Sequence, residues 1–329
     1  MSQGSKSNWK PAASFEAIKS RARMLQAIRA FFAERQVQEV ETPCLARSAI
    51  PDPHLHSFQT QFLGQRLYLQ TSPEFFMKRL LASGSGDIYQ IARVFRDDEL
   101  GSRHNPEFTL LEWYRLGLDH HQLMDEIQQL LIQLLDRLGS RINVHDVRRL
   151  SYQQAFVEVL DIDPLACTVQ QLQQMAQQRA IEVPQGMVMD DKDMWLDWLM
   201  SQSVAPAFAK DRFSFIYDYP ASQAALARIS TQDSRLAHRF ELFYGDLELA
   251  NGFYELTDAN EQRQRFEQEN RHRFAKGMPE MALDENLLSA LDQGMPECSG
   301  VAIGLDRLLM VLSGKSHISE VLSFPLDRV

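Results

Sequence analysis

The segment 93–114 constrains the fold of this chain more than any other part of its sequence. Residues 88–95 predict a strand, and residues 107–114 alternate between apolar and polar well enough to predict its partner. The segment 97–106 between them is polar and contains glycine and proline, as a long hairpin loop should. We therefore expect a β-hairpin here and, with it, an antiparallel sheet.

This hairpin also carries a distinctive set of donors. Arg96 follows the first strand, and Arg103 and His104 lie in the loop. Arginine offers a planar fork of N–H groups that binds both carboxylates and phosphates. The pattern therefore suits a ligand that combines a polyphosphate with a carboxylate. The alternative interpretation is a solvated hairpin with ordinary surface charges.

The composition is that of a globular protein, with 44% hydrophobic and 24% charged residues in 329, enough for one to three domains. No apolar run could cross a bilayer, and the N-terminus has no apolar segment of a signal peptide. The three cysteines are scattered without metal-ligand spacing, which favours the reducing cytoplasm over a disulfide framework. A net charge of −10 without an obvious basic stripe lowers the expectation of a nucleic-acid partner.

The remaining patterns predict an α+β fold with one domain at 15–329 behind an N-terminal tail at 1–14. The expected helices span 15–35, 119–138, several stretches within 151–209, 259–276, 284–291 and 305–312, and a further helix opens at 71–74. The expected strands span 37–45, 55–62, 66–70, 213–219, a pair within 240–256, and 299–303. The region 117–210 shows no chemical clustering, and we interpret it as a helical insertion or lid. Strands that meet mainly by hairpins, with helices outside them, predict an antiparallel β-sheet flanked by helices.

A second chemical cluster lies on the predicted strand pair, where Glu241, Glu248 and Glu255 recur at intervals of seven. A turn between the strands could bring Glu241 and Glu248 together. Carboxylate oxygens suit Mg²⁺, which commonly binds one or two carboxylates plus substrate phosphates. Glu255 could instead pair with a cationic substrate. The alternative is that all three are outward-facing residues of an amphipathic strand.

Two further clusters lie where helices begin. Gly304 and Arg307 stand at a strand-to-helix joint, where free N–H groups and the positive helix end favour a phosphate. A tight joint with a surface ion pair between Arg307 and the preceding aspartate explains this pattern equally well. At the other helix, Ser72 could cap the first turn and Pro73 suits its start. Glu74 would bind an amine if it is buried at the mouth of the sheet. The alternative is that this segment is only a capped helix start.

In this order, the clusters resemble the signature motifs of the class II aminoacyl-tRNA synthetase catalytic domain. Residues 95–98 (FRDD) and 104–109 (HNPEFT) are similar to its second motif, 304–307 (GLDR) to its third, and 40–43 (VETP) to its first, which in that family builds the dimer interface. The details are most similar to lysyl-tRNA synthetase, at 72–74 (SPE), 111–114 (LEWY) and 248–255 (ELANGFYE). The resemblance covers nearly the whole chain from about residue 15 and implies the class II catalytic fold.

The resemblance implies a nucleotide site. Arg96 and Arg307 would be the catalytic residues, with Arg96 on the substrate carboxylate and α-phosphate and Arg307 across the adenine from Phe108. Glu241 and Glu248 would carry Mg²⁺. The residues implied to bind ATP are Arg96, Asp98, Arg103, His104, Asn105, Phe108, Glu248, Leu249, Gly304 and Arg307. Asp98 departs from the family, which usually has glutamate at this adenine contact.

The resemblance also implies an amino-acid site. Glu74 would bind the amino group near the carboxylate, whereas Glu112, Tyr114 and Glu255 would enclose a distal ammonium, whose burial without an anion would be costly. The residues implied to bind the amino acid are Ser72, Pro73, Glu74, Glu112, Tyr114, Glu255 and Ala302. The chemistry would be adenylation, driven by positioning and charge stabilisation.

Two departures from lysyl-tRNA synthetase direct the functional interpretation. The chain is expected to begin almost at the catalytic domain, since roughly 15 residues cannot form the anticodon-binding domain that precedes it in that family. Ala302 stands where lysyl-tRNA synthetases have glycine, and one methyl can shift the position of an amino group for a few kcal/mol at most.

These features resemble the family of elongation factor P–(R)-β-lysine ligases, stand-alone paralogues of lysyl-tRNA synthetase. The resemblance implies an ATP-dependent ligase that activates (R)-β-lysine as an adenylate and transfers it to a lysine ε-amino group of translation elongation factor P. It implies ATP and Mg²⁺, a homodimer in the cytoplasm, and no membrane or tRNA partner. The alternatives are a truncated enzyme that charges tRNA with lysine and a non-catalytic homologue that senses an amino acid. An ammonia-using asparagine synthetase is disfavoured because Glu112 and Glu255 stand where a cation would be needed.

Overall fold

The protein is described by a computed structural model over residues 9–184, 186–188 and 190–329. Its helices are α1 (Phe15–Glu34), α2 (Glu74–Ala82), α3 (His120–Leu138), α4 (Tyr152–Leu160), α5 (Val169–Gln178), α6 (Lys192–Leu199), α7 (Ala259–Ala275), α8 (Glu285–Gly294) and α9 (Leu305–Leu312). Its strands are β1 (Gln38–Glu39), β2 (Leu45–Ala46), β3 (Gln59–Phe62), β4 (Gln65–Leu69), β5 (Ile88–Phe95), β6 (Glu107–Leu116), β7 (Arg148–Ser151), β8 (Phe213–Pro220), β9 (Leu236–Tyr244), β10 (Leu247–Tyr254) and β11 (Cys298–Gly304). None of the helices in these ranges is long and apolar enough to cross a membrane.

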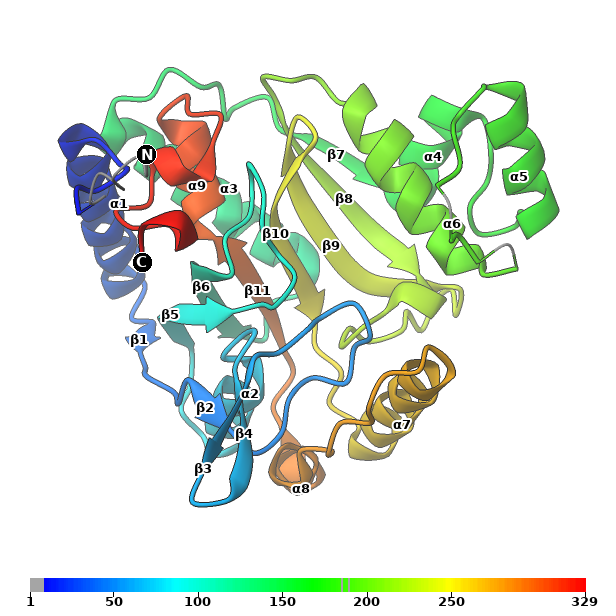
Figure 1. The fold of residues 1–329 in the computed structure, drawn as a ribbon, viewed down its shortest axis with the longest axis horizontal. Helices are drawn as coiled ribbons and strands as arrows, with labels where there is room; N and C mark the ends of the chain where they lie inside the picture. Colours follow the sequence, from blue (N-terminus) through cyan, green and yellow to red (C-terminus); the bar gives the residue numbers. More distant parts are fainter. Residues whose placement is uncertain (1–8, 185, 189) are drawn as a thin grey trace, which may run out of the picture.

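Among the described residues, eight strands form one large sheet in the order β1-β5-β6-β11-β10-β9-β8-β7. All neighbours in it are antiparallel except the short edge pairs β1–β5 and β7–β8. Figure 1 shows this sheet through the middle of the molecule, with α1 and α9 beside one end and α4 to α6 beside the other. The predicted α+β class and the antiparallel sheet flanked by helices are confirmed.

The predicted hairpin is present as β5 and β6, with Ile88 opposite Tyr114 and Phe95 opposite Glu107. Alternation along β6 divides its side chains between two faces. Leu111 and Trp113 are fully buried in the main core with α1 and α3, whereas Glu112 and Tyr114 line a cavity on the other face. A slip of one residue would exchange the two sets, so the apolar residues fix the register.

The back layer of the sheet consists mainly of α1 and α3, which pack against each other. Ser14 accepts a hydrogen bond from Ala17 N at 3.1 Å and caps α1, and Asp119 forms a capping box at the start of α3. The tail predicted at 1–14 is partly fixed, since Ala12 N donates to Ser323 O at 2.8 Å. Residues 1–8 lie outside the described residues.

A helical lobe built from α4, α5 and α6 packs on the far end of the sheet around its own apolar cluster. This lobe also holds a short π-helix (Met200–Val204) and a 3₁₀ turn (Ala205–Ala207). Within the range 117–210 proposed as an insertion, α3 packs in the main core and β7 pairs with β8 in the large sheet. The amphipathic pattern of α3 could not reveal which apolar cluster it joins.

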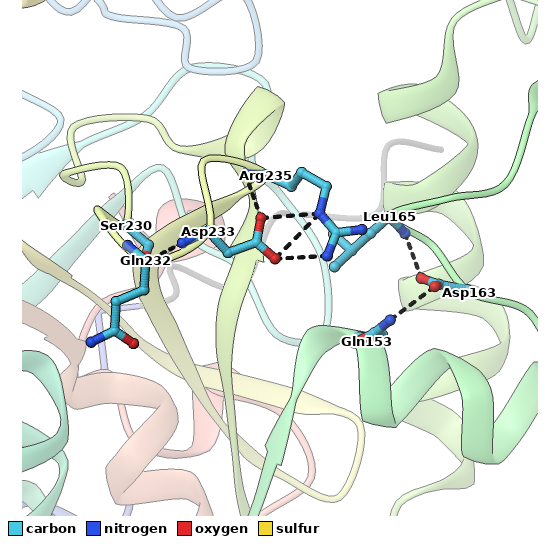
Figure 2. Close-up of polar contacts among 7 residues, drawn as sticks. All are labelled: Gln153, Asp163, Leu165, Ser230, Gln232, Asp233 and Arg235. Carbon is cyan, nitrogen blue, oxygen red and sulfur yellow. Dashed lines mark hydrogen bonds and ion pairs between the residues drawn. The ribbon is translucent and has the colours of Figure 1, made fainter.

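The loop before β9 lies near the α4–α5 connection of this lobe (Figure 2). Arg235 binds both carboxylate oxygens of Asp233, with Nη2 to Oδ2 at 2.7 Å. Across from it, Asp163 accepts hydrogen bonds from Leu165 N and Gln153 Nε2, both at 2.9 Å. These contacts order the loop before β9 and the connection between α4 and α5.

A smaller sheet in the order β2-β4-β3 and the helices α2, α7 and α8 complete the fold on the cavity side. The strand predicted at 37–45 is too long. Within this range β1 pairs with β5 in the large sheet, whereas β2 belongs to the smaller sheet. α2 begins at Glu74 with Pro73 as its N-cap residue, so Ser72 precedes the cap position predicted for it. Ser72 Oγ nevertheless accepts a hydrogen bond from Glu74 N at 3.0 Å.

Candidate active site

Two adjoining cavities lie on the face of the large sheet that α1 and α3 leave uncovered. The first, of about 540 Å³, has acidic residues at its floor, and the second, of about 370 Å³, is rich in arginine. Arg96, Asn251 and Ala302 line both cavities and therefore mark their junction. One elongated ligand could span the two.

The acidic cavity brings together residues from α2, β6 and β10. Glu112 is 2% exposed, and it accepts hydrogen bonds from Ser72 Oγ at 2.7 Å and Tyr114 Oη at 2.8 Å. Glu255 is 1% exposed at the end of β10. The sequence-predicted residues Ser72, Glu74, Glu112, Tyr114, Glu255 and Ala302 all line this cavity. Pro73 does not line it.

A lysine that the sequence analysis did not select lies within this acidic group. Lys78 Nζ is 2.7 Å from Glu74 Oε1 and 2.7 Å from Glu255 Oε2, and its side chain is 1% exposed. Burial opposes its charge, but the two carboxylates outweigh burial and hold the pKa of Lys78 above its ordinary value. Lys78 follows Glu74 by four residues on α2, so helical spacing offered a signal for this pair.

The remaining carboxylates of this cavity are hard to ionise. Burial, followed by the charge of Glu74, raises the pKa of Glu112 to about 8. Burial also raises the pKa of Glu255 to about 7, against the opposing charge of Lys78. Such shifts indicate carboxylates that lack enough positive charge around them, as expected for a site that binds a cation.

Gly300 forms part of the cavity wall, where no side chain fits. A Cβ atom there would lie 2.3 Å from the Tyr114 ring and 2.6 Å from Glu255 Oε1. Ala302, two residues later on β11, lies between Glu112 and Asn251 of the flanking strands. Its methyl group therefore faces the junction of the two cavities.

The arginine-rich cavity holds the sequence-predicted residues of the hairpin loop. The guanidinium of Arg96 lies 5.1 Å from the Phe108 ring centre, and its Nη1 is 3.3 Å from Glu99 Oε1. Arg103 lies in the loop and makes a two-pronged ion pair with Asp246, at 3.0 and 3.1 Å. Arg96 Nε is buried without a hydrogen-bond partner among the described residues, so donors remain for a ligand.

Arg307 and His104 complete the wall of this cavity. Arg307 donates from Nε to Arg103 O at 3.2 Å and from Nη1 to Glu248 O at 3.1 Å, which fixes its side chain across the cavity. Burial, and then the charge of Arg307, lowers the pKa of His104. The neighbouring Asp306 is 2% exposed and binds Arg21 and Thr109 N, so the surface ion pair considered for it is not formed.

The two predicted metal carboxylates line the same cavity. Burial, followed by the charge of Glu241, raises the pKa of Glu248 to about 7. Glu241 Oε1 is 2.5 Å from Arg239 Nη2, and Arg239 also donates to Asn251 Oδ1 at 3.3 Å. Sequence analysis did not select Arg239, although it precedes Glu241 by two residues and thus shares its strand face.

Three of the residues predicted to bind ATP, Asp98, Asn105 and Leu249, make contacts in the structure that the sequence did not predict. Asp98 is 80% exposed, lies 3.6 Å from His56, and does not line the cavity. Asn105 does line it, but its amide donates to Glu107 O at 2.7 Å and accepts from Leu326 N at 3.0 Å. Leu249 is buried in the main core, and its carbonyl lies near Gly304 at the cavity.

Comparison with known proteins agrees with this geometry. The family described as tRNA synthetases class II (D, K and N) matches residues 9–328. The chain belongs to this family. It is similar to proteins named elongation factor P–(R)-β-lysine ligase from Hamiltonella defensa subsp. Acyrthosiphon pisum (strain 5AT) and from Salmonella typhi. The first is 48% identical over 330 residues, which cover 98% of each chain, and the second is 48% identical over 326 residues, which cover 97% of this chain and 98% of the relative.

The resemblance seen in the sequence is confirmed along the chain, and the related ligases are covered almost from end to end. The roles of individual side chains rest on the geometry described above.

Proposed function

We propose that this protein is an ATP-dependent ligase that activates (R)-β-lysine as an aminoacyl-adenylate and transfers it to a lysine of elongation factor P. The observation that carries the proposal is the junction of a buried acidic cavity with an arginine-rich one at Arg96 and Ala302. The names of the relatives supply the identity of the acceptor and of the amino acid.

The charge of the buried group around Lys78 matches a diamino acid. In this group Glu74, Glu112 and Glu255 would carry three negative charges when ionised and Lys78 carries one positive charge, which leaves two negative charges. β-Lysine brings two ammonium groups. Its carboxylate would then point towards Arg96 at the junction, away from these three glutamates, which would repel it.

The arginine-rich cavity suits the triphosphate. Arg103 and His104, which line this cavity, would contact the outer phosphates, and Arg96 and Arg307 would hold the α-phosphate and the adenine. An amino-acid carboxylate oxygen attacks the α-phosphorus, the bond from phosphorus to the bridging oxygen breaks, and pyrophosphate leaves. The chain contributes by aligning the two substrates and stabilising charge on the phosphate oxygens.

Glu241 and Glu248 fit a Mg²⁺ ion. They are two neighbouring carboxylates whose mutual repulsion contributes to the raised pKa of Glu248, and a divalent cation would relieve that repulsion. Bound Mg²⁺ would supply charge neutralisation for the phosphates. Arg239 binds Oε1 of Glu241, so the metal would be held mainly by Glu248 and the second oxygen of Glu241.

In the second step, the ε-amino group of the acceptor lysine attacks the carbonyl carbon of the adenylate. The bond from the carbonyl carbon to the bridging phosphate oxygen breaks, and AMP leaves. The attacking amine loses one proton as the amide forms. We further propose a homodimer, through the edge near β1 that resembles the first class II motif, and a cytoplasmic location, which the free cysteines Cys44, Cys167 and Cys298 support.

The proposal is tested by incubating the protein with ATP, Mg²⁺ and labelled (R)-β-lysine or α-lysine, with elongation factor P or tRNA-Lys as acceptor. Label on elongation factor P, strongest with β-lysine, supports the ligase. Label on tRNA alone would replace it with a minimal synthetase. ATP–pyrophosphate exchange without transfer to either acceptor would leave activation intact and refute the acceptor assignment.

A further inference from the structure

Three histidines and an aspartate converge on the opposite face of the sheet from the two cavities. His120 Nε2 is 3.3 Å from Asp218 Oδ1, and His238 Nδ1 is 3.5 Å from the same oxygen. The rings of His120 and His121 lie 4.2 Å apart, and those of His120 and His238 lie 4.7 Å apart. One potential ligand atom from each of His120, His121 and Asp218 lies within 4.8 Å of the others.

Separate elements of the fold position this group. His120 and His121 open α3 directly after its capping aspartate, and Asp218 lies in β8 where the pairing with β9 shifts register. A bulge of this kind re-aims a side chain. Asp218 also has φ of 55°, a left-handed conformation that L residues seldom adopt. Such local strain is often found at binding sites.

The group is buried at its centre and incompletely bonded. His120 is 4% exposed, and neither ring nitrogen makes a hydrogen bond of good geometry with a described residue. A buried imidazole whose two nitrogens make no hydrogen bond of good geometry with the described residues therefore lies beside a carboxylate oxygen, an arrangement that a cation would complete.

We propose that His120, His121 and Asp218 bind a divalent transition-metal ion of the zinc class, with His238 hydrogen-bonded to the aspartate as an outer partner. Imidazole nitrogen with one carboxylate oxygen is a donor set that zinc prefers. Zinc–ligand bonds of about 2.0–2.1 Å in a tetrahedron place ligand atoms about 3.3–3.4 Å apart. The 3.3 Å between His120 and Asp218 already meets this spacing. His121 is exposed and can rotate the remaining distance.

This site is distinct from the reacting centre. His238 and Arg239 are neighbours on β9, but alternation sends Arg239 into the cavities and His238 to the face of α3. A metal bound here would tie the start of α3 to β8. The expected effect is thus on stability, with no direct contact to the substrates.

The test is titration of the chelator-treated full chain with Zn²⁺ and with Co²⁺, whose visible absorption reports tetrahedral nitrogen and oxygen ligands. Cys44 is exposed and can bind zinc by itself, so every protein carries Cys44→Ser. We expect one equivalent of tightly bound metal, a tetrahedral Co²⁺ spectrum, and a Tm that rises with added Zn²⁺.

Two variants and a control make the result specific. His121→Ala and Asp218→Asn should each weaken Zn²⁺ binding at least ~10-fold and abolish the Tm rise, since loss of one ligand removes a bond. Asparagine tolerates the left-handed backbone, and His121 is exposed, so both variants should fold. His145→Ala, at an exposed histidine outside the group, should bind as the parent does. Equal binding by both variants, or no binding by the parent at millimolar Zn²⁺, would overturn the proposal.

Discussion

Replacement of Lys78 by methionine tests whether the buried ammonium stabilises the acidic cavity. Lys78 lies 2.7 Å from oxygens of both Glu74 and Glu255 and is 1% exposed. Methionine has a similar length and helix propensity, so Lys78→Met removes the charge without removing the bulk of the side chain. It leaves two buried carboxylates without their shared partner.

The magnitude follows from burial and from the pKa values. Removing one partner of a buried ion pair costs about 3–5 kcal/mol. The pKa of Glu255 is raised to about 7 even beside Lys78. The free energy of unfolding therefore already falls as the pH rises from the unfolded pKa of about 4.3 to the folded pKa of about 7. In Lys78→Met that pKa rises further, and the cost keeps growing above pH 7. The pKa of Lys78 itself is raised, so its contribution is constant well below about 10.4.

We therefore expect Lys78→Met to lower the free energy of unfolding by about 3–5 kcal/mol at pH 8.5. At pH 6 this loss should be smaller by at least ~1.4 kcal/mol. Urea denaturation at both pH values, with unchanged m values, measures the difference. Lys19→Met, at an exposed lysine of α1, is the matched control and should change stability by less than about 0.5 kcal/mol. A loss below about 1 kcal/mol at pH 8.5, or an equal loss at both pH values, would refute the reasoning.

The other predictions concern the ligand. Glu255→Gln should raise KM for β-lysine by ~10-fold or more while the Kd of ATP changes less than ~2-fold; equal weakening of both would contradict its place in the amino-acid cavity. Ala302→Gly should shift the α-lysine to β-lysine ratio of kcat/KM by ~10-fold towards α-lysine, and an unchanged ratio would remove this methyl from the specificity argument. Affinity for β-lysine should rise ~10-fold or more from pH 6 to pH 8, because Glu112 and Glu255, with pKa values near 8 and 7, must ionise to bind ammonium groups. Calorimetry should detect proton release on binding, and flat affinity over this range would exclude that role.

Much of the fold could be predicted because its strongest signals are local. The strand pattern at 88–95 and the alternation at 107–114 predicted the bounds of β5 and β6 to within two residues, and the helical patterns predicted α1, α3 and α9. The same rule places Glu112 and Tyr114 together on one face, opposite Trp113. Residues that alternate on a strand share a face whatever the rest of the chain does.

The rest of the site depends on contacts between distant segments. Asn105 is held by Leu326 N, 221 residues away, and Asp306 is held by Arg21 of α1. No local pattern predicts such pairs. The limits of the helical lobe depend on such contacts too, since α3 and α4 are both amphipathic and join different apolar clusters.

The row of small residues on β11 explains how the two cavities can share a wall and still differ. Gly300, Ala302 and Gly304 alternate with Val301 and Ile303, which are buried in the main core. At position 300 a Cβ would collide with a ring and a carboxylate, whereas at 304 its nearest neighbour would be a carbonyl oxygen at 3.9 Å. The wall is thus full at the acidic cavity and open at the arginine-rich cavity. Ala302 lies between these two positions and lines both cavities, and we expect its methyl group to limit how closely the amino acid approaches the nucleotide.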